Sequence, residues 1–330
     1  MIELNADPPA LRAVFAADET EALFDLLSAA RITRVLVHQV LGFPPGVLDG
    51  LAGFVAGRQA VFYAHDFYTI CPRVTMIDAT GQFCDIAPLE TCERCIAAGG
   101  AHEASHPDAP DPADHRARMG VLLRAFRHVV TPSRNTAEYF RRVWPDLAVT
   151  PVPHPEPKQA IAFAPRTAPS NEVVLLGGIG PHKGSAALLA IARRARLSHP
   201  DLRFRVIGHT DIDPVLRDLG NVLITGRYEE RELADLLGRS AARIALFLHI
   251  WPETYSYTLG EAVAYGLYPL VPDLGAPAER VREAGWGAVF GFPIEVNEVL
   301  AAIATALARP PAGRDELGPA RFGHPDSAST

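Results

Sequence analysis

The sequence predicts an α/β protein with two doubly wound parallel sheets, each in a domain of its own. Short apolar runs that indicate buried strands alternate with stretches whose apolar residues recur at helical spacing. Several of the strand-like runs end in glycine, which is typical of a doubly wound sheet with its ligand crevice at the carboxyl ends of the strands. The length of 330 residues suits about two domains.

The first half of the chain alternates strands with helices. We expect strands at 33–40, 60–66, 128–133 and 147–154, and helices at 19–30, 46–56, 114–126 and 134–143. The Pro- and Ala-rich stretch 153–169 is interpreted as a hinge. We therefore divide the chain into an N-terminal domain, 1–160, and a C-terminal domain, 161–308. The remainder, 309–330, is rich in Pro, Gly and Ser and is expected to be disordered.

The second half continues the same alternation. Apolar runs predict strands at 172–176, 204–209, 221–228, 242–249 and 268–273. A helix is expected between two of them at 229–240, where apolar residues recur at helical spacing, and another after the last strand.

Two carboxylates lie in the segment 249–266, which predicts a buried strand, a tight turn and a helix. Glu253 stands in the turn and Glu261 lies more than one helical turn further on, so the pair could reach two parts of one elongated ligand. The helix is expected to begin near Ser256, where its free N–H groups and positive dipole end would face an anion. From the spacing alone, one capping Glu and one solvated Glu explain the pattern equally well.

A glycine-rich turn follows the strand at 172–176. Its three glycines let backbone N–H groups approach phosphate oxygens, and Lys183 adds a positive charge at the start of the next helix. The pattern is neither a Walker loop, which needs Gly-Lys-Ser/Thr, nor a complete GxGxxG fingerprint. A structural turn is the simpler explanation of this stretch taken alone.

Together, these motifs between Glu172 and Pro293 resemble the nucleotide-sugar-binding domain of glycosyltransferase family 4, whose members are retaining GT-B enzymes. They run GG-x-G-x-x-KG, VIG, TGRY, PETYSYTLGEA, YGLYPLV and GAPAERV, and the two Glu residues eight positions apart are the most specific element. The PETYSYTL form is similar to enzymes of bacterial surface-polysaccharide assembly. The resemblance implies the GT-B fold: two Rossmann-like domains facing across a cleft, here with an abbreviated N-terminal domain.

The resemblance also implies roles for single residues. Glu253 would lie beside the donor sugar, Glu261 would hold the ribose hydroxyls, and Lys183 would neutralise the donor diphosphate. The other residues expected at the donor are Gly177, Gly178, Gly180, Arg227, Ser256, Tyr257 and Thr258. The family carries a basic residue at the place of Gly178, so either Arg227 or a residue of the other domain supplies the cation, or turnover is slow or lost.

The N-terminal domain contributes one expected catalytic residue. His65 and Asp66 end a predicted strand, and a His at this place resembles the family histidine that approaches the transferred sugar. A surface His bonded to its own loop is the alternative, and His38 is interpreted as structural. Ser133 and Arg134 precede a helix, where an N-cap is favoured over an anion site. The first residues, 1–14, contain no glycine-rich loop for an acceptor.

The reaction that the resemblance implies is transfer of a sugar from a nucleotide-diphosphate donor to an acceptor hydroxyl, with retention. The donor is a co-substrate, and the acceptor would be a saccharide or a lipid-linked saccharide. Glu253, Lys183 and His65 are the expected catalytic residues. Two other classes stay open: a catalytically weak GT-B homologue that serves as a binding or scaffold subunit, and a GT-B epimerase or phosphorylase.

Composition excludes some other classes. The net charge of −7 and the lack of a basic patch argue against a nucleic-acid-binding protein. No run of about 18 apolar residues exists, and the start Met-Ile-Glu-Leu lacks the features of a signal peptide. We therefore expect a cytoplasmic protein, with a peripheral contact at the inner membrane face left open.

All four cysteines of the chain, Cys71, Cys84, Cys92 and Cys95, fall in one loop segment directly after His65. Cys92 and Cys95 form a CxxC pair, and the other two could complete a tetrahedral thiolate site. Because disulfides are rare in the cytoplasm, a structural zinc that orders the loop is favoured. An iron–sulfur cluster, free thiols and disulfides are the alternatives. A site closed by four cysteines would have no catalytic role.

Overall fold

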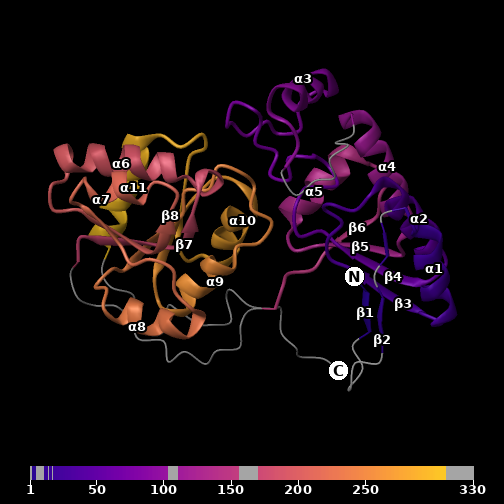
Figure 1. Cartoon of the computed structure of the whole chain (residues 1–330). Coiled ribbons are helices and arrows are strands. Elements are labelled where there is room, and N and C mark those ends of the chain that lie inside the picture. Colours follow the sequence, from indigo (N-terminus) through magenta and orange to yellow (C-terminus); the bar gives the residue numbers. More distant parts are fainter. Residues whose placement is uncertain are drawn as a thin grey trace. The chain divides into compact units, whose positions relative to one another are not determined.

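The computed structural model describes residues 2–4, 11–13, 15–16, 18–102, 111–155 and 170–309. The chain divides into two compact units (Figure 1). The first comprises Met1–Thr80, Cys84–Pro132 and Ala137–Val152, and the second comprises Gly81–Phe83, Ser133–Thr136 and Pro153–Thr330. Most of the expected hinge, from residue 156 to 169, and the expected tail, from residue 310 on, lie outside the described residues.

A parallel sheet of four strands forms the centre of the first unit. Its strand order is β3-β4-β5-β6, and each strand pairs in parallel with the next. The strands are β3 (Arg34–Val37), β4 (Gln59–Tyr63), β5 (His128–Thr131) and β6 (Val149–Pro151), and the helices between them are α2 (Pro45–Val55), α3 (Leu89–Gly99), α4 (Pro112–Ala125) and α5 (Arg134–Val143), with α1 (Thr20–Ala29) before β3. The predicted parallel α/β character of this half is confirmed.

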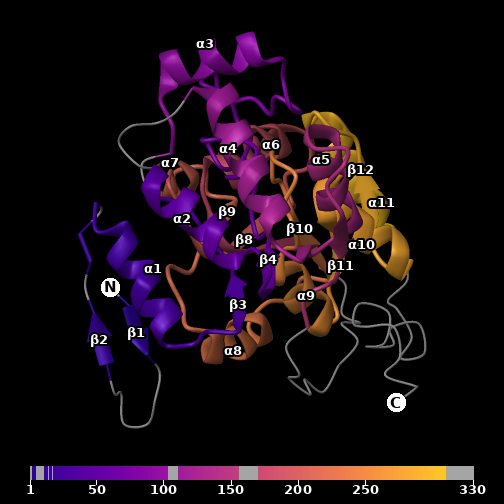
Figure 2. The same ribbon diagram turned by 90° about the vertical axis from the view of Figure 1, so that its right-hand side faces the viewer.

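Burial in the first unit follows the alternation of side chains along a strand. Ala60 and Phe62 of β4 are buried, whereas Val61 and Tyr63 are only half-buried. Phe62 meets Phe126, just after α4, edge to face at 5.5 Å between ring centroids. Helices α2 and α4 pack against each other beside this cluster (Figure 2).

Two features of the first unit were not predicted. Strands β1 (Ile2–Leu4) and β2 (Leu11–Ala13) form an antiparallel pair, and each is too short to show an alternating pattern in the sequence. The cysteine segment, expected to be a loop, contains helix α3. Pro88 immediately precedes this helix and Gly100, with φ 67°, ends it. No residue of α3 is buried, which is why no apolar periodicity revealed it.

The second unit contains a six-stranded parallel sheet in the order β12-β11-β10-β7-β8-β9. Its strands are β7 (Glu172–Ile179), β8 (Arg203–Thr210), β9 (Val222–Ile224), β10 (Ile244–Leu246), β11 (Tyr268–Pro272) and β12 (Ala288–Phe290). Its helices are α6 (Ser185–Ser198), α7 (Asp213–Arg217), α8 (Leu233–Gly238), α9 (Tyr257–Ala264), α10 (Gly275–Ala284) and α11 (Val296–Ala308), with short 3₁₀ turns η1 (Pro181–Lys183) and η2 (Glu230–Glu232).

Both faces of this second sheet are buried. Val173 and Leu175 of β7 belong to a core formed with α6, α7 and α11, whereas Val174 and Leu176 belong to a core formed with α8, α9 and α10. Figure 1 shows α6 and α11 on one side of β7 and β8, and α8 and α9 on the other. A sheet covered on both faces produces strands that are continuously apolar. The predicted doubly wound arrangement of this half is therefore confirmed.

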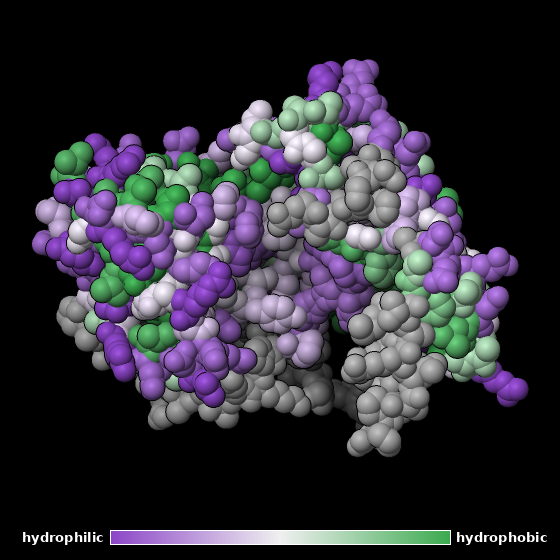
Figure 3. Space-filling model, in the orientation of Figure 1, coloured by the Kyte–Doolittle hydropathy of each residue, from purple (hydrophilic) through white to green (hydrophobic). Residues whose placement is uncertain are grey.

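The described surface is mostly polar. Figure 3 shows hydrophilic residues over much of the visible face, with apolar residues in scattered groups. The exposed large apolar side chains come from many different elements, and scattered residues of this kind are normal for a protein surface. Within the ranges that the structure describes, no helix combines the length and the apolar character needed to cross a bilayer.

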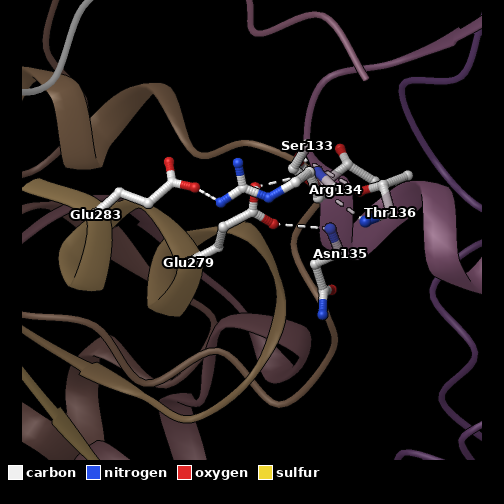
Figure 4. A network of polar contacts seen from close by, with 7 residues as sticks. Ser133, Arg134, Asn135, Thr136, Glu279 and Glu283 are labelled. Atoms are coloured by element: carbon white, nitrogen blue, oxygen red, sulfur yellow. Dashed lines mark hydrogen bonds and ion pairs between the residues drawn. The ribbon is translucent and has the colours of Figure 1, made fainter. Parts of the chain in front are cut away.

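Residues Ser133–Thr136, which include the start of α5, belong to the second unit and contact α10 there (Figure 4). Ser133 is the N-cap that the sequence favoured, because its Oγ accepts from the Thr136 backbone N–H at 3.1 Å. The carboxylate of Glu279 in α10 accepts from the backbone N–H groups of Arg134 and Asn135, at 3.1 and 2.7 Å. The anion at this helix end is therefore the protein's own carboxylate.

Replacing Glu279 by Ala should lower the free energy of unfolding by about 1–3 kcal/mol, because two backbone donors lose a charged acceptor. Glu283→Ala on the next turn of α10 is the matched control. In the described part of the chain its carboxylate pairs with the Arg134 side chain, and both groups are largely exposed, so the expected loss is about 0–1 kcal/mol. Urea denaturation measures both variants, and equal losses would contradict the capping role of Glu279.

Candidate functional site

The residues singled out in the second unit follow the carboxyl ends of its strands. Gly177 and Gly178 lie within β7, because the strand continues to Ile179 instead of ending at residue 176 as predicted, and Lys183 ends the 3₁₀ turn between β7 and α6. Glu253 follows β10, and α9 begins at Tyr257, one residue after the predicted start. A Cβ added to Gly177 would lie 3.5 Å from the methyl group of Thr258, so the glycine turn and the start of α9 are neighbours. The structure therefore brings these two motifs together.

Close backbone approach explains one of the glycines at this edge. Gly208 of β8 pairs with Gly177 of β7 and has a φ of 136°. A Cβ at Gly208 would lie only 2.0 Å from the Gly177 carbonyl oxygen, which no side chain could tolerate. The two strands can approach in this way only because Gly208 has no side chain.

Lys183 and Glu253 form an ion pair inside this region. The Lys183 Nζ and the Glu253 Oε1 are 3.6 Å apart, and their side chains are 30% and 7% exposed. Two histidines lie near the pair. His249 is buried, and its Nε2 donates to the Leu274 carbonyl oxygen at 3.1 Å, whereas His182 directly precedes Lys183. A buried carboxylate needs such partners because isolated charges are costly inside a protein.

The surroundings keep Glu253 ionised. Burial alone would raise the pKa of Glu253, but the nearby His249 and Lys183 and a hydrogen bond from Ser256 outweigh burial and lower it. Burial lowers the pKa of His249 and of His182, and Lys183 lowers both further. The site therefore combines an ionised carboxylate with a Lys side chain and two imidazoles whose pKa values are lowered.

Glu261 lies in the middle of α9, close to two tyrosines. Burial, followed by the charge of Glu261, raises the pKa of Tyr228 to about 12 and also raises that of Tyr265. The side chain of Glu261 is partly exposed. Its position leaves the carboxylate able to accept hydrogen bonds from neutral hydroxyl groups.

The turn between Glu253 and α9 has a strained backbone that Arg280 holds in place. Ser256 has a φ of 74°, which is uncommon for a residue with a side chain. Arg280 of α10 donates to the carbonyl oxygens of Tyr255 and Ser256, at 3.1 and 2.7 Å, and its guanidinium lies 4.2 Å from the centre of the Tyr255 ring. Strain of this kind persists only where surrounding contacts enforce it. The sequence gave no sign of Arg280.

The structure offers a second basic group near Gly178. A Cβ added to Gly178 would lie 3.1 Å from the ring of His209, the residue that pairs with Gly178 across β7 and β8. Arg227, which the sequence suggested as a compensating cation, follows β9 with an exposed side chain. Sequence reasoning missed His209, although its place at the end of a predicted strand could have revealed it.

His65 of the first unit is also at the carboxyl end of a strand. Its Nε2 is hydrogen-bonded to the Nδ1 of His38 at 2.8 Å, and the two rings are stacked. Asp66 accepts from the backbone N–H of Tyr68 and from the side-chain amide of Gln39. Burial, then His38, lowers the pKa of His65, and burial raises that of Asp66. His38, interpreted as structural, is therefore a direct partner of His65.

The four cysteines line one small cavity of the first unit, about 20 Å³ in volume. All four are free thiols and partly exposed. Burial raises the pKa of Cys71 to about 12 and also raises that of Cys84. In the described part of the chain, no three His, Cys, Asp or Glu side chains are arranged as a metal site. The predicted zinc site thus stays a proposal.

No model of a known protein family matches the sequence, and no curated protein matches it. Solved structures do match. HepE of Anabaena, in complex with UDP, has a TM-score of 0.56 at 14% identity, over 87% of this chain and 72% of HepE. Sucrose-phosphate synthase of Thermosynechococcus elongatus has a TM-score of 0.60 at 15% identity, over 93% of this chain and 76% of the synthase.

A trehalose-phosphate synthase of Burkholderia xenovorans, in complex with glucose-6-phosphate, has a TM-score of 0.59 at 12% identity, over 93% of this chain and 72% of that enzyme. All three are glycosyltransferases of the same two-domain α/β class. The chain has the GT-B fold. At such low identity the similarity shows the fold alone.

In the GT-B fold of this chain, the second unit combines a glycine-rich turn, a buried ion pair and a helix start at one edge of its sheet. Backbone N–H groups and Lys183 can bind an anion there, and the carboxylates of Glu253 and Glu261 can accept from hydroxyl groups. The arrangement is chemically suited to a ligand that carries both phosphate and hydroxyl groups.

The turn that carries Glu253 depends on close contact with α10. Gly275 has a φ of 71°, and a Cβ there would lie within 2.7–2.8 Å of the Glu253 backbone nitrogen and oxygen. Gly275→Ala should therefore lower the free energy of unfolding by about 1–3 kcal/mol more than Gly285→Ala. Gly285, at the other end of α10, also has a positive φ, of 63°, but has nothing within 4 Å of an added Cβ. Denaturation followed by fluorescence compares the two variants, and equal losses would rule out steric support of the turn.

Proposed function

We propose that the chain is a retaining glycosyltransferase that moves a sugar from a nucleotide-diphosphate donor to an acceptor hydroxyl. The observation that carries the proposal is the buried pair of Lys183 and Glu253 beside the glycine turn, with Glu261 on the adjoining helix. The structurally similar HepE was crystallised with UDP, with UDP and glucose, and with UDP-glucose. These complexes support a nucleotide sugar as donor.

The ion pair suggests how a donor would engage the site. In the described structure, Lys183 has Glu253 as its partner. A donor diphosphate would compete for Lys183, since a phosphate carries more charge and more acceptor oxygens than one carboxylate. Glu253 would then be released to accept a hydrogen bond from a hydroxyl of the donor sugar.

The chemical step needs mainly electrostatic stabilisation. The bond between the anomeric carbon and the donor phosphate oxygen breaks, the acceptor oxygen bonds to that carbon on the same face, and the acceptor proton passes to the departing phosphate. Negative charge grows on that phosphate in the transition state. Lys183, the backbone N–H groups of Gly177–Gly180 and the N-terminal end of α9 would stabilise it. His209 is a further donor beside Gly178, where the family carries a basic residue.

His65 enters the proposal as the residue that would approach the transferred sugar. Its support is its place after β4 and its hydrogen bond with His38, which fixes the ring. The acceptor would be a saccharide or a lipid-linked saccharide, as in bacterial polysaccharide or glycoconjugate assembly. We place the protein in the cytoplasm, with an optional peripheral contact at the inner membrane face.

Glu261→Ala should weaken binding of a nucleoside diphosphate, because a carboxylate bonded to ribose hydroxyls loses charge-assisted hydrogen bonds of about 1.5–3 kcal/mol each. Titration calorimetry with a panel of nucleoside diphosphates measures the affinity of the parent and the variant. Asp201→Ala, at an exposed position of the same unit, is the control and should leave the affinity unchanged. A folded Glu261→Ala chain that binds as tightly as the parent would refute the ribose role.

Lys183→Ala should lower the rate of donor turnover by about 10²–10³-fold while weakening donor binding much less, since the phosphate is more negative in the transition state. Arg193→Ala on the exposed side of α6 is the control. Lys183→Arg should retain more of the rate because it keeps the charge. Gly178→Arg adds the missing cation and should raise the rate, provided that the ring of His209 moves aside.

Donor hydrolysis and transfer are measured together in these experiments, with unfolding followed in parallel. An unchanged rate in Lys183→Ala would make the glycine turn purely structural. A parent chain that binds nucleoside diphosphates but neither hydrolyses nor transfers the donor would be a binding or scaffold subunit instead.

A further inference from the structure

We propose that Cys71, Cys84, Cys92 and Cys95 bind one divalent metal ion of the zinc class, and that this ion holds the segment 71–99 in place. The inference lies outside the proposed glycosyl transfer. The four cysteines belong to the first unit, and the test of the proposal does not depend on any donor or acceptor.

The first argument is that the four cysteine side chains come together at one cavity. The four cysteines come from two turns and one helix, yet all four line the same cavity of about 20 Å³, close to the space that one small ion or water occupies. Most of the other lining residues are apolar, including Ile70, Ile77 and Ile96. The thiols are therefore the main ligand groups that meet there. The structure does not arrange three of them as a metal site, so metal binding requires the side chains to turn from the cavity wall onto a common centre.

The second argument is the backbone around the first two cysteines. The N–H of Arg73 donates to the sulfur of Cys71, and the N–H groups of Ile86 and Ala87 donate to the sulfur of Cys84. In both cases, the chain curls around the sulfur so that N–H groups two or three residues later point at it. Each of these two sulfurs is therefore held in place by the backbone of its own turn.

The curled turns are strained. Val74, Met76, Asp85 and Ile86 all have a positive φ, between 48° and 68°, and they account for most of the side-chain-bearing residues of this kind in the described chain. Val74 and Ile86 are β-branched, for which this region is a genuine outlier. A backbone of this kind persists only where something over-determines it. A metal ion held by the adjoining sulfurs would provide that constraint.

The third argument is the helix that carries the other two cysteines. Cys92 and Cys95 are one helical turn apart on α3, so their side chains lie on the same face. The guanidinium of Arg116 donates to the sulfur of Cys92 at 3.5 Å. Four thiolates around a divalent ion leave a net charge of −2, which Arg116 would partly neutralise.

The fourth argument concerns the contacts that hold α3 against the rest of the unit. None of its residues is fully buried, so apolar packing alone holds it weakly. The side chain of Arg73 donates to the carbonyl oxygens of Gly99 and Gly100, at 2.9 and 2.8 Å, and fastens the C-terminal end. A metal at Cys92 and Cys95 would fasten the other end. Because the four ligands are thiolates, which are soft, zinc is the matching common cation, and a closed site has only a structural role.

The test is elemental analysis of the full chain, purified under inert gas with a phosphine reductant and no chelator. We expect about one zinc per chain, and no free thiols until the metal is removed, after which four should titrate. The titration is unambiguous because the chain has only these 4 cysteines. Cys92→Ser and Cys95→Ser should each lower the bound zinc about tenfold or more.

Thr91→Ala is the matched control, since Thr91 lines the same cavity and adjoins Cys92 but is not a proposed ligand. It should retain about one zinc per chain. Removal of zinc from the parent should speed hydrogen exchange in 71–99 and leave that of residues 170–309 unchanged. Substoichiometric metal with four freely titratable thiols, disulfides in the purified chain, or iron with visible absorbance would each overturn the proposal.

Discussion

The second unit depends on one buried charge. Glu253 is 6% exposed, and a carboxylate in that position is tolerable only if cations and donors surround it. Lys183 on the glycine turn and His249 after β10 meet this requirement, and they come from different strand ends. The need to pair this carboxylate therefore fixes where the ends of β7 and β10 lie relative to each other. The candidate donor site is built around that pairing.

The same need extends to α10. Gly275 at its start lies against the backbone of Glu253, and Arg280 on its next turn clamps the carbonyl groups of Tyr255 and Ser256. Glu279, between them, caps the N-terminus of α5. One helix thus supports the strained turn before α9 on one side and the segment 133–136 on another. Any movement of α10 would therefore displace both the turn before α9 and the segment 133–136.

The sequence predicted correctly those strands that are buried on both faces of the sheet. The strands of the second unit are apolar on both faces, so their runs are continuous, and the start of α9 is marked by polar residues directly before an apolar stretch. It failed where local signals are absent. Helix α3 buries nothing and β12 has only three residues, so neither leaves a periodic pattern. Glu279 lies 145 residues from Arg134, and no local pattern identifies a capping partner at that distance. The roles assigned to site residues rest on the resemblance and on this geometry.

The hydrogen bond between the stacked rings of His38 and His65 couples the positions of their protons. Its two facing nitrogens, 2.8 Å apart, share one hydrogen, so one ring donates and the other accepts. If His38 donates from Nδ1, its outer nitrogen, Nε2, carries no hydrogen, and the outer nitrogen of His65, Nδ1, carries one. If His65 donates from Nε2 instead, the outer nitrogen of His38 carries the hydrogen and that of His65 does not. The tautomers of the two rings are therefore locked to each other. A proton taken up at the bare outer nitrogen of one ring can leave from the outer nitrogen of the other, with the shared hydrogen crossing between them.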